Sequence, residues 1–294
     1  GGDAPPGAQL ALFGDLPAGP AAGPGLRLAP LPAPAPPPVH DVRRLSYTAL
    51  ALFARCPYRY FAERALGLSP AAAERSGESG GPLAATEVGD AVHRLLELVP
   101  LAAPAAPPRP ELDALVRGWY PAVTGEELDR IAALVDAYCG SSLARRVAAL
   151  PGARPERPFA FEHDGVLLHG RLDVLWREGS RALVVDYKSN ALEGARPAAV
   201  VEQEYRLQRL VYALACLRDG AGEVEVVYQF LERPEDVVGA VFTAADRTVL
   251  EAELSEAIAR IRAGEFPPTP SEHACAGCPA LDLVCAGPRL PGRG

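Results

Sequence analysis

The sequence predicts an α/β fold in which a central mixed sheet is flanked by helices. Short segments of alternating apolar residues lie in the middle of the chain, and segments with helical apolar spacing lie on both sides of them. An apolar content of 49% in 294 residues is enough to build a sizeable core. The expected order is helices, three strands, a helix and further strands.

The first forty residues differ from the rest of the chain. They are dominated by Pro, Ala and Gly, a composition that buries too little apolar surface to offset the entropy of ordering. We therefore expect residues 1–40 to be a disordered linker and residues 41–294 to form the globular domain. The sequence has no methionine, even at position 1, which leads us to expect a fragment or a trimmed product.

Helical signals precede the predicted strands. Ser46 can cap a helix that continues to about Gly67, and a second helix is expected to begin after Thr86. A third helix is predicted over 126–150, and the Pro-rich stretch 100–110 separates it from the second.

Strand signals follow. The segments 157–163, 165–176 and 181–188 are joined by Asp164-Gly165 and Glu178-Gly179-Ser180, so an antiparallel meander is expected. The remaining predicted elements are a helix at 198–217, strands at 224–231 and 238–242, and a helix at 246–263.

Two acids lie among strand-forming apolar residues. Asp173 is in the second predicted strand and Asp186 in the third, and hairpin pairing would bring both towards the same end of the sheet. Because side chains alternate along a strand, Asp186 and Lys188 point to one face and Tyr187 to the other. Carboxylates that hold Mg2+ beside a lysine suit phosphodiester hydrolysis. An isolated Asp-x-Lys is more often a surface ion pair.

Four separated segments resemble the RecB-like branch of the PD-(D/E)XK nucleases, in the order that this family has. They are Gly89-Asp90-Ala91-Val92-His93-Arg94-Leu95-Leu96-Glu97, Gly170-Arg171-Leu172-Asp173-Val174-Leu175, Val184-Val185-Asp186-Tyr187-Lys188 and Gln208-Arg209-Leu210-Val211-Tyr212. The resemblance extends from Leu45 to the C-terminus, and it implies a restriction-endonuclease-like core.

The resemblance also implies roles for individual residues. The side chains expected at the catalytic centre are Asp173, Asp186, Lys188, Gln208 and Tyr212. The expected ligands of Mg2+ or Mn2+ are His93, Asp173, Asp186 and the backbone carbonyl of Tyr187. Glu156, just before the first predicted strand, is a further candidate acid.

Six cysteines in a chain of this size favour metal binding over a disulfide framework. The four that could form one ligand set are Cys56, Cys275, Cys278 and Cys285. Their arrangement is similar to the iron-sulfur subset of the same family, the AddB type, and implies a 4Fe-4S cluster that joins the N- and C-terminal segments. Zn2+ is the alternative, because four thiolates suit it equally well. Cys139 and Cys216 are expected to be ordinary buried thiols.

The resemblance implies a Mg2+-dependent deoxyribonuclease, an exonuclease rather than an endonuclease, that serves DNA repair or recombination. Its substrate would be single-stranded or unwinding DNA, supplied by a UvrD- or AddAB-type helicase in the same chain or in a partner subunit. The rival interpretation is a catalytically silent DNA-binding or scaffolding module of the same fold. The net charge of -8 is unfavourable for DNA binding, but residues 41–75 carry six arginines against three acids, a net charge of +3.

One short apolar cluster interrupts the predicted linker. Gln9-Leu10-Ala11-Leu12-Phe13 resembles the peptide by which bacterial DNA-processing proteins dock on the sliding clamp, with Gln9, Leu10, Leu12 and Phe13 as the binding residues. Apolar runs elsewhere are too short to cross a bilayer and no leader opens the sequence, so we expect a cytoplasmic protein without a membrane partner.

Overall fold

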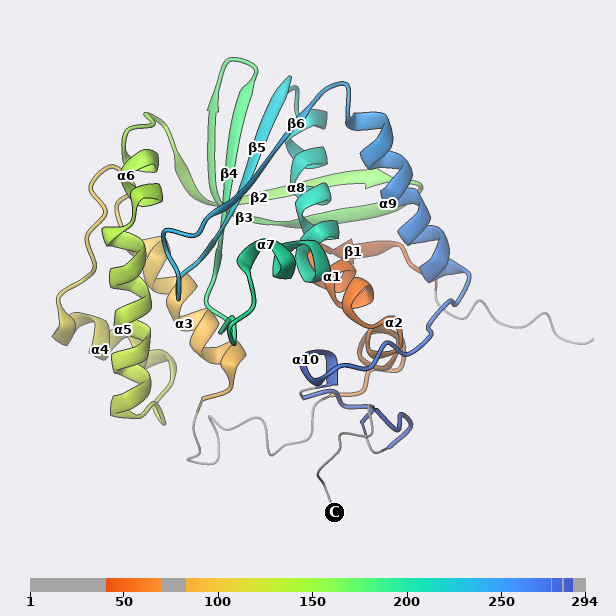
Figure 1. Cartoon of the computed structure of the whole chain (residues 1–294), viewed down its shortest axis with the longest axis horizontal. Coiled ribbons are helices and arrows are strands. Elements are labelled where there is room, and N and C mark those ends of the chain that lie inside the picture. The colour runs from red at the N-terminus through yellow and green to blue at the C-terminus, as the bar shows by residue number, and fades with distance from the viewer. Residues whose placement is uncertain (1–40, 70–82, 276, 282, 288–294) are drawn as a thin grey trace, which may run out of the picture. The chain divides into compact units, whose positions relative to one another are not determined.

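The computed structural model of the chain describes residues 41–69, 83–275, 277–281 and 283–287 (Figure 1). The strands are β1 (Arg44–Ser46), β2 (Arg154–His163), β3 (Val166–Glu178), β4 (Arg181–Lys188), β5 (Glu223–Phe230) and β6 (Val238–Thr243). The α-helices are α1 (Tyr47–Arg55), α2 (Pro57–Tyr60), α3 (Ala85–Leu98), α4 (Arg109–Trp119), α5 (Gly125–Gly140), α6 (Ser142–Ala148), α7 (Pro197–Val200), α8 (Arg206–Arg218), α9 (Arg247–Arg262) and α10 (Glu272–Cys275). Two π-helical segments are η1 (Phe61–Ala65) and η4 (Val201–Tyr205). The predicted linker and its clamp-like peptide lie outside the described residues.

The strands form one mixed sheet, as the sequence predicts. Its order is β1-β3-β4-β5-β6, with β2 paired to β3 as well. The meander of β2, β3 and β4 is antiparallel, which confirms the predicted hairpins. After β4 the chain crosses through α7, η4 and α8 and returns in β5, parallel to β4, and β6 then pairs with β5 antiparallel.

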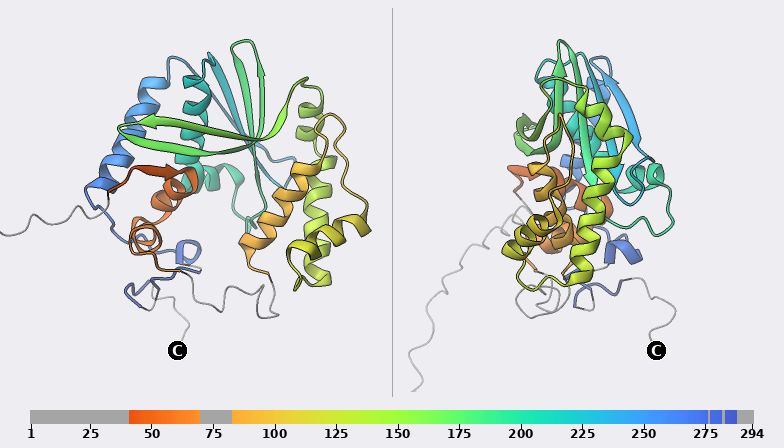
Figure 2. Two further views of the ribbon diagram at one scale, coloured as in Figure 1. Left: turned by 180° about the vertical axis from the view of Figure 1, so that it is seen from behind. Right: turned by 90° about the vertical axis from the view of Figure 1, so that its left-hand side faces the viewer.

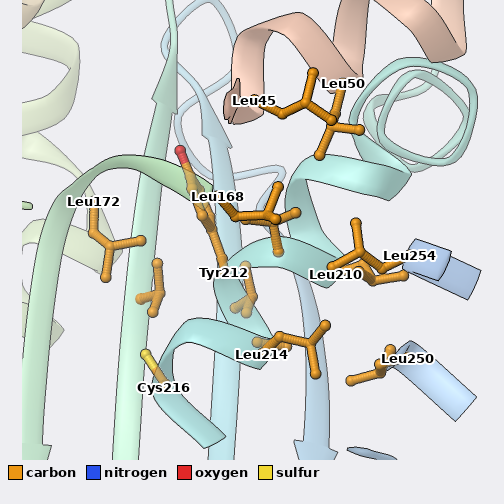
Figure 3. Packing of buried hydrophobic residues seen from close by; sticks show 14 of the residues in the cluster. Leu45, Leu50, Leu168, Leu172, Leu210, Tyr212, Leu214, Cys216, Leu250 and Leu254 are labelled. Atoms are coloured by element: carbon orange, nitrogen blue, oxygen red, sulfur yellow. The ribbon is translucent and has the colours of Figure 1, made fainter. Parts of the chain in front are cut away.

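Helices cover both faces of the sheet, and each face has its own hydrophobic core (Figure 2). Members of the first, the α8 core, include Leu50, Leu168, Val184, Leu210, Tyr212 and Leu254. Figure 3 shows how α1, α8 and α9 contribute side chains to it. Members of the second, the α3 core, include Val92, Leu95, Ile131, Tyr138 and Val185. Val184 and Val185 are neighbours on β4 and point to opposite faces of the sheet, so this strand contributes side chains to both cores.

Strand β3 exchanges its two faces at Asp173. Leu172 packs in the α8 core and Val174 in the α3 core, although residues two apart on a regular strand share a face. The β2–β3 register places Glu156 opposite Asp173, at a position that the ladder skips, and Glu156 has a φ of 50°. In Figure 1, β2 and β3 lie across the direction of β4 before β3 turns to run beside it. The bend therefore brings Asp173 to the junction of the two cores.

Several helices are shorter than predicted. The first predicted helix ends at Arg55, because Cys56 is extended ahead of Pro57, and a further helical turn and η1 follow. The helix predicted over 126–150 is two helices, because Ser141 caps a new start by accepting a hydrogen bond from the Ala144 N–H at 3.1 Å.

Other differences concern elements that were not predicted. Strand β1 was missed, and it pairs parallel to β3 over only three residues. Helix α4 begins within the Pro-rich stretch, at Arg109, where Pro110 is tolerated in the first helical turn. The helix predicted at 198–217 is interrupted by η4. Cys216 is buried as expected, whereas Cys139 is only partly buried.

Within the described ranges, no helix combines the length and the apolar character that a bilayer crossing requires.

Candidate active site

Asp173 and Asp186 lie on adjacent strands and are both buried, with 8% and 2% of their surface exposed. The backbone N–H of Tyr187 donates to Asp173 Oδ2 at 2.7 Å. This bond ties the Asp173 carboxylate to β4, so both carboxylates are held at the same end of the β3–β4 hairpin. The side chain of Tyr187 packs in the α3 core, on the opposite face from Asp186, as alternation predicts.

Lys188 is enclosed by polar and aromatic groups. Its Nζ lies 2.6 Å from Asp186 Oδ2, donates to Gln208 Oε1 at 3.0 Å, and lies 4.1 Å from the centre of the Tyr205 ring. Burial disfavours the charged form, but Asp186 outweighs this effect and the pKa of Lys188 is above its usual value. The ammonium group is therefore charged at neutral pH.

Helix α8 supports Asp186 through two residues one turn apart. Gln208 Nε2 and the Tyr212 hydroxyl each donate to Asp186 Oδ1 at 3.0 Å. Gln208 Nε2 also donates to the Tyr212 oxygen at 2.7 Å. Burial raises the pKa of Tyr212 well above its usual value, so this hydroxyl keeps its proton. The two side chains fix one oxygen of Asp186.

His93 reaches the site from α3. Its Nδ1 lies 3.5 Å from Asp173 Oδ1. Burial opposes the charge of His93, but Asp173 and Asp186 together outweigh this effect and raise the pKa of His93 to about 9. Helix α3 packs closely against Ser189, the residue that follows β4. This close contact depends on Gly89, because a β-carbon there would lie 2.9 Å from Ser189 Oγ.

Glu156 belongs to the same group of side chains. It lies within β2 and not before it, which corrects the position expected from the sequence. Ligand atoms of His93, Glu156 and Asp173 all lie within 4.8 Å of one another, and Asp186 is outside this group. Arg171 donates to Glu156 Oε2 at 3.1 Å. Burial and Asp173 raise the pKa of Glu156, against the effect of Arg171.

The residues present fit a divalent cation that prefers oxygen ligands. Two carboxylates and an imidazole converge, with Asp186 on the adjacent strand, and burial raises the pKa of Asp186 more than Lys188 lowers it. Asp186 Oδ2 is buried and accepts no well-directed hydrogen bond from the described residues, so its partner there is the Lys188 charge alone. A cation bound here would give this buried oxygen a second positively charged partner, and His93 would release its proton to act as a ligand.

A cavity of about 660 Å3 opens onto these residues. Besides the groups already described, it is lined by arginines and tyrosines that the sequence did not single out as site residues: Tyr47, Arg55, Arg64, Arg171 and Tyr205. Arg171 lies two residues before Asp173. This position in the sequence, close to a predicted metal ligand, could have identified Arg171 as a site residue. Arginines and aromatic rings are suited to phosphates and to unstacked bases.

The C-terminal segment with three cysteines lies against α2 (Figure 1). Arg59 donates to the carbonyls of Ala274 and Gly277 at 3.0 and 3.3 Å. Burial raises the pKa of Cys278, and Cys56 is among the groups that raise it further. Cys56 is buried, and the thiols predicted to accompany it, Cys275, Cys278 and Cys285, are partly buried. The structure thus brings the segments of the predicted set together without showing a ligand geometry.

A family profile described as the PD-(D/E)XK nuclease superfamily matches residues 44–285. The matched region includes the strands of the mixed sheet and the carboxylates, lysine and imidazole described above. No curated protein matches the chain significantly.

Two solved structures resemble this one. A candidate exonuclease from Eubacterium rectale has a TM-score of 0.50 and 13% identity, covering 83% of this chain and 90% of that one. A protein called SSO0001 has a TM-score of 0.39 and 14% identity, covering 84% of this chain and 88% of that one. At 13% identity, the similarity to the Eubacterium rectale protein shows a shared fold and nothing more.

Proposed function

Because this chain belongs to the PD-(D/E)XK nuclease superfamily, we propose that it is a Mg2+-dependent nuclease that hydrolyses phosphodiester bonds in DNA. The observation that carries the proposal is the contact set around Asp186, where Lys188, Gln208 and Tyr212 meet one buried carboxylate beside Asp173. An acid and a lysine on one face of a strand suffice for an ion pair, but two helix residues that orient the same acid support a catalytic role.

Each side chain has a defined task in this proposal. A cation held by His93, Asp173 and Asp186 would supply Lewis-acid chemistry for attack on the phosphate. Lys188 keeps its proton on Nζ and counters negative charge that develops on phosphate oxygens. Gln208 and Tyr212 hold Oδ1 of Asp186, which leaves Oδ2 facing Lys188.

The test is cleavage of end-labelled single-stranded DNA with Mg2+ by the native protein and by Asp186→Asn. We expect a loss of at least about 100-fold in rate, a size typical for removal of one stabilising group. The matched control is Asp129→Asn, an acid whose side chain is 71% exposed on α5. Equal cleavage by Asp186→Asn would refute the site. DNA binding without cleavage by the native protein would favour the silent module.

The exonuclease preference rests on the implied family branch and on the name of the Eubacterium rectale protein. Circular single-stranded DNA distinguishes the alternatives, because an exonuclease leaves it intact whereas an endonuclease opens it. We expect linear DNA to be degraded and circular DNA to survive.

We also propose that Cys56, Cys275, Cys278 and Cys285 bind a 4Fe-4S cluster. Support comes from the contacts of Arg59, which lies three residues after Cys56, with the carbonyls of Ala274 and Gly277 in the C-terminal segment. Four iron atoms and four sulfides per chain are expected, and Cys278→Ser should lose them whereas Cys139→Ser should not. One zinc ion per chain and no iron would overturn the proposal.

A helicase partner and a sliding clamp remain proposals from the resemblance. A peptide of residues 7–15 should bind a bacterial clamp in fluorescence polarisation, and replacement of Leu12 and Phe13 by alanine should abolish binding. Equal binding by both peptides would exclude specific docking.

A further inference from the structure

We propose that Glu156 is a ligand of the catalytic cation, together with His93 and Asp173. This inference rests on the proposed nuclease function and adds a carboxylate from β2 to the ligands expected from the sequence. The cation would then be bound by α3, β2 and β3, next to Asp186 on β4.

The first argument is distance. The ligand atoms of His93, Glu156 and Asp173 lie within 4.8 Å of one another. In an octahedral Mg2+ site with bonds of about 2.1 Å, opposite ligand atoms lie about 4.2 Å apart. The three side chains therefore need only small movements to share one ion.

The second argument is the backbone of Glu156. Its φ of 50° is in the left-handed region, which is unfavourable for residues with a β-carbon. The other non-glycine residues with positive φ among the described residues are Asp164 and Glu193, and both stand next to a glycine in a turn. Glu156 alone has this conformation inside a strand. Such strain often occurs where a side chain must be aimed at a functional site.

The third argument is what the local conformation does to side-chain direction. Beyond the bend, alternate residues of β2 such as Phe159 and Phe161 pack against the α8 core. Continuing this alternation backwards would direct Arg157 inward and Glu156 outward. In the structure Arg157 is exposed and the Glu156 side chain is only 17% exposed, so the bend reverses the alternation and turns the acid into the cavity.

The competing explanation is an ion pair with Arg171. That contact uses one oxygen of Glu156, at 3.1 Å, and the Arg171 side chain is 59% exposed. An exposed arginine can pair with an acid in an ordinary strand conformation, and such pairs stabilise proteins little. The ion pair with Arg171 alone does not explain why the side-chain alternation of β2 is reversed at Glu156, beside His93 and Asp173.

The experiment measures Mn2+ affinity of the metal-free protein by calorimetry, which does not depend on cleavage. We expect Glu156→Gln to weaken Mn2+ binding at least about 10-fold and to raise the Mg2+ concentration for half-maximal cleavage similarly. The matched control is Glu162→Gln, which removes an exposed carboxylate from the same strand and should change neither value. Circular dichroism checks that both variants fold.

Arg171→Gln separates the two explanations. If Glu156 binds the cation, loss of Arg171 leaves Mn2+ affinity unchanged or higher, because the carboxylate is freed. An equal loss in Glu156→Gln and Arg171→Gln would overturn the inference in favour of the ion pair.

Native Mn2+ affinity in Glu156→Gln would also overturn the inference. If Asp186→Asn still abolished cleavage, the proposed function would stand without it. A native protein that binds Mn2+ through Glu156 but cleaves no DNA would instead contradict the proposed function alone.

Discussion

Glu156 combines a strained backbone with a partly buried acid, and the two effects can be separated by substitution. Glu156→Gly and Glu156→Ala both remove the carboxylate, but only glycine adopts a φ of 50° without a β-carbon penalty. We expect the glycine variant to have a free energy of unfolding about 1 kcal/mol above that of the alanine variant, measured with urea in EDTA. Equal stabilities would mean that the conformation carries no strain.

His93 makes stability depend on pH when metal is removed. Its pKa is about 9 in the folded protein and 6.5 in the unfolded chain, because Asp173 and Asp186 together outweigh burial. The folded state therefore binds the proton more tightly, and this stabilisation is complete below pH 6.5 and is lost as the pH rises through about 9. In EDTA, the stability difference between native protein and His93→Gln should shrink between about pH 5.5 and about pH 10, roughly one unit beyond each pKa. A constant difference would contradict this account.

The shared face of Asp186 and Lys188 was predictable from alternation along β4, and hairpin pairing placed Asp173 near them. Their catalytic role was implied by the resemblance. The resemblance placed Gln208 and Tyr212 at the catalytic centre, but their shared contact with Asp186 was not predicted. Glu156 was noted only as an acid near a strand. Its direction depends on a left-handed residue opposite Asp173, and no periodic pattern in the sequence reports such a conformation.

At the scale of elements, α1 approaches β3 closely at Gly170. A β-carbon there would lie 2.4 Å from Tyr47 Cδ1 and 2.8 Å from the Phe159 ring. Gly170→Ala should therefore lower the free energy of unfolding by about 1–3 kcal/mol and lower cleavage, because Tyr47 lines the cavity.

The control for this prediction is Gly118→Ala in α4, where an added β-carbon meets nothing within 4 Å. It should raise stability by about 0.5–1 kcal/mol, since alanine favours helices over glycine. Urea unfolding of both variants measures the contrast. A Gly170→Ala variant as stable as the native protein would show that Tyr47 moves aside freely.

The antiparallel meander was predictable because its turns have strong local signals, and both Asp164 and Gly165 have the positive φ such a turn requires. Helix interruptions were less visible. The interruption at Cys56 depends on an extended residue ahead of Pro57, and that at Ser141 depends on a side-chain cap. Strand β1 was missed because three residues show no period, and its parallel partner β3 is far along the chain.

At the scale of the whole molecule, a net charge of -8 must be reconciled with a polyanionic substrate. Arg64 and Arg171 are both exposed and line the cavity, where they supply positive charge among acids that include Asp90 and Glu156. In metal-free buffer, Arg171→Ala should weaken single-stranded DNA binding and reduce the slope of log affinity against log salt by about 0.7.

Arg109→Ala is the control for that measurement, because Arg109 lies on α4, pairs with two acids and does not line the cavity. It should leave the salt slope unchanged. If both variants behaved alike, the cavity arginines would not be the phosphate contacts.

The fold class followed from the order of helices and strands, because a meander followed by a crossover helix leaves few arrangements of the sheet. The exchange of faces along β3 did not follow. It arises from the bend at Asp173, which depends on how β2 and β3 pair over their whole length. The approach of the C-terminal cysteines to α2 was implied by the resemblance and by no local pattern.

The bend in β3 also offers a means of inhibition. Asp173 stands where the strand changes faces, so a small rotation there alters its distance from Asp186 on straight β4. A separate pocket of about 260 Å3, lined by Leu172, Leu175 and Cys216 among others, borders the bend near the far end of α8. A compound bound in this pocket should alter the spacing of the two carboxylates without occupying the cavity that the DNA would enter.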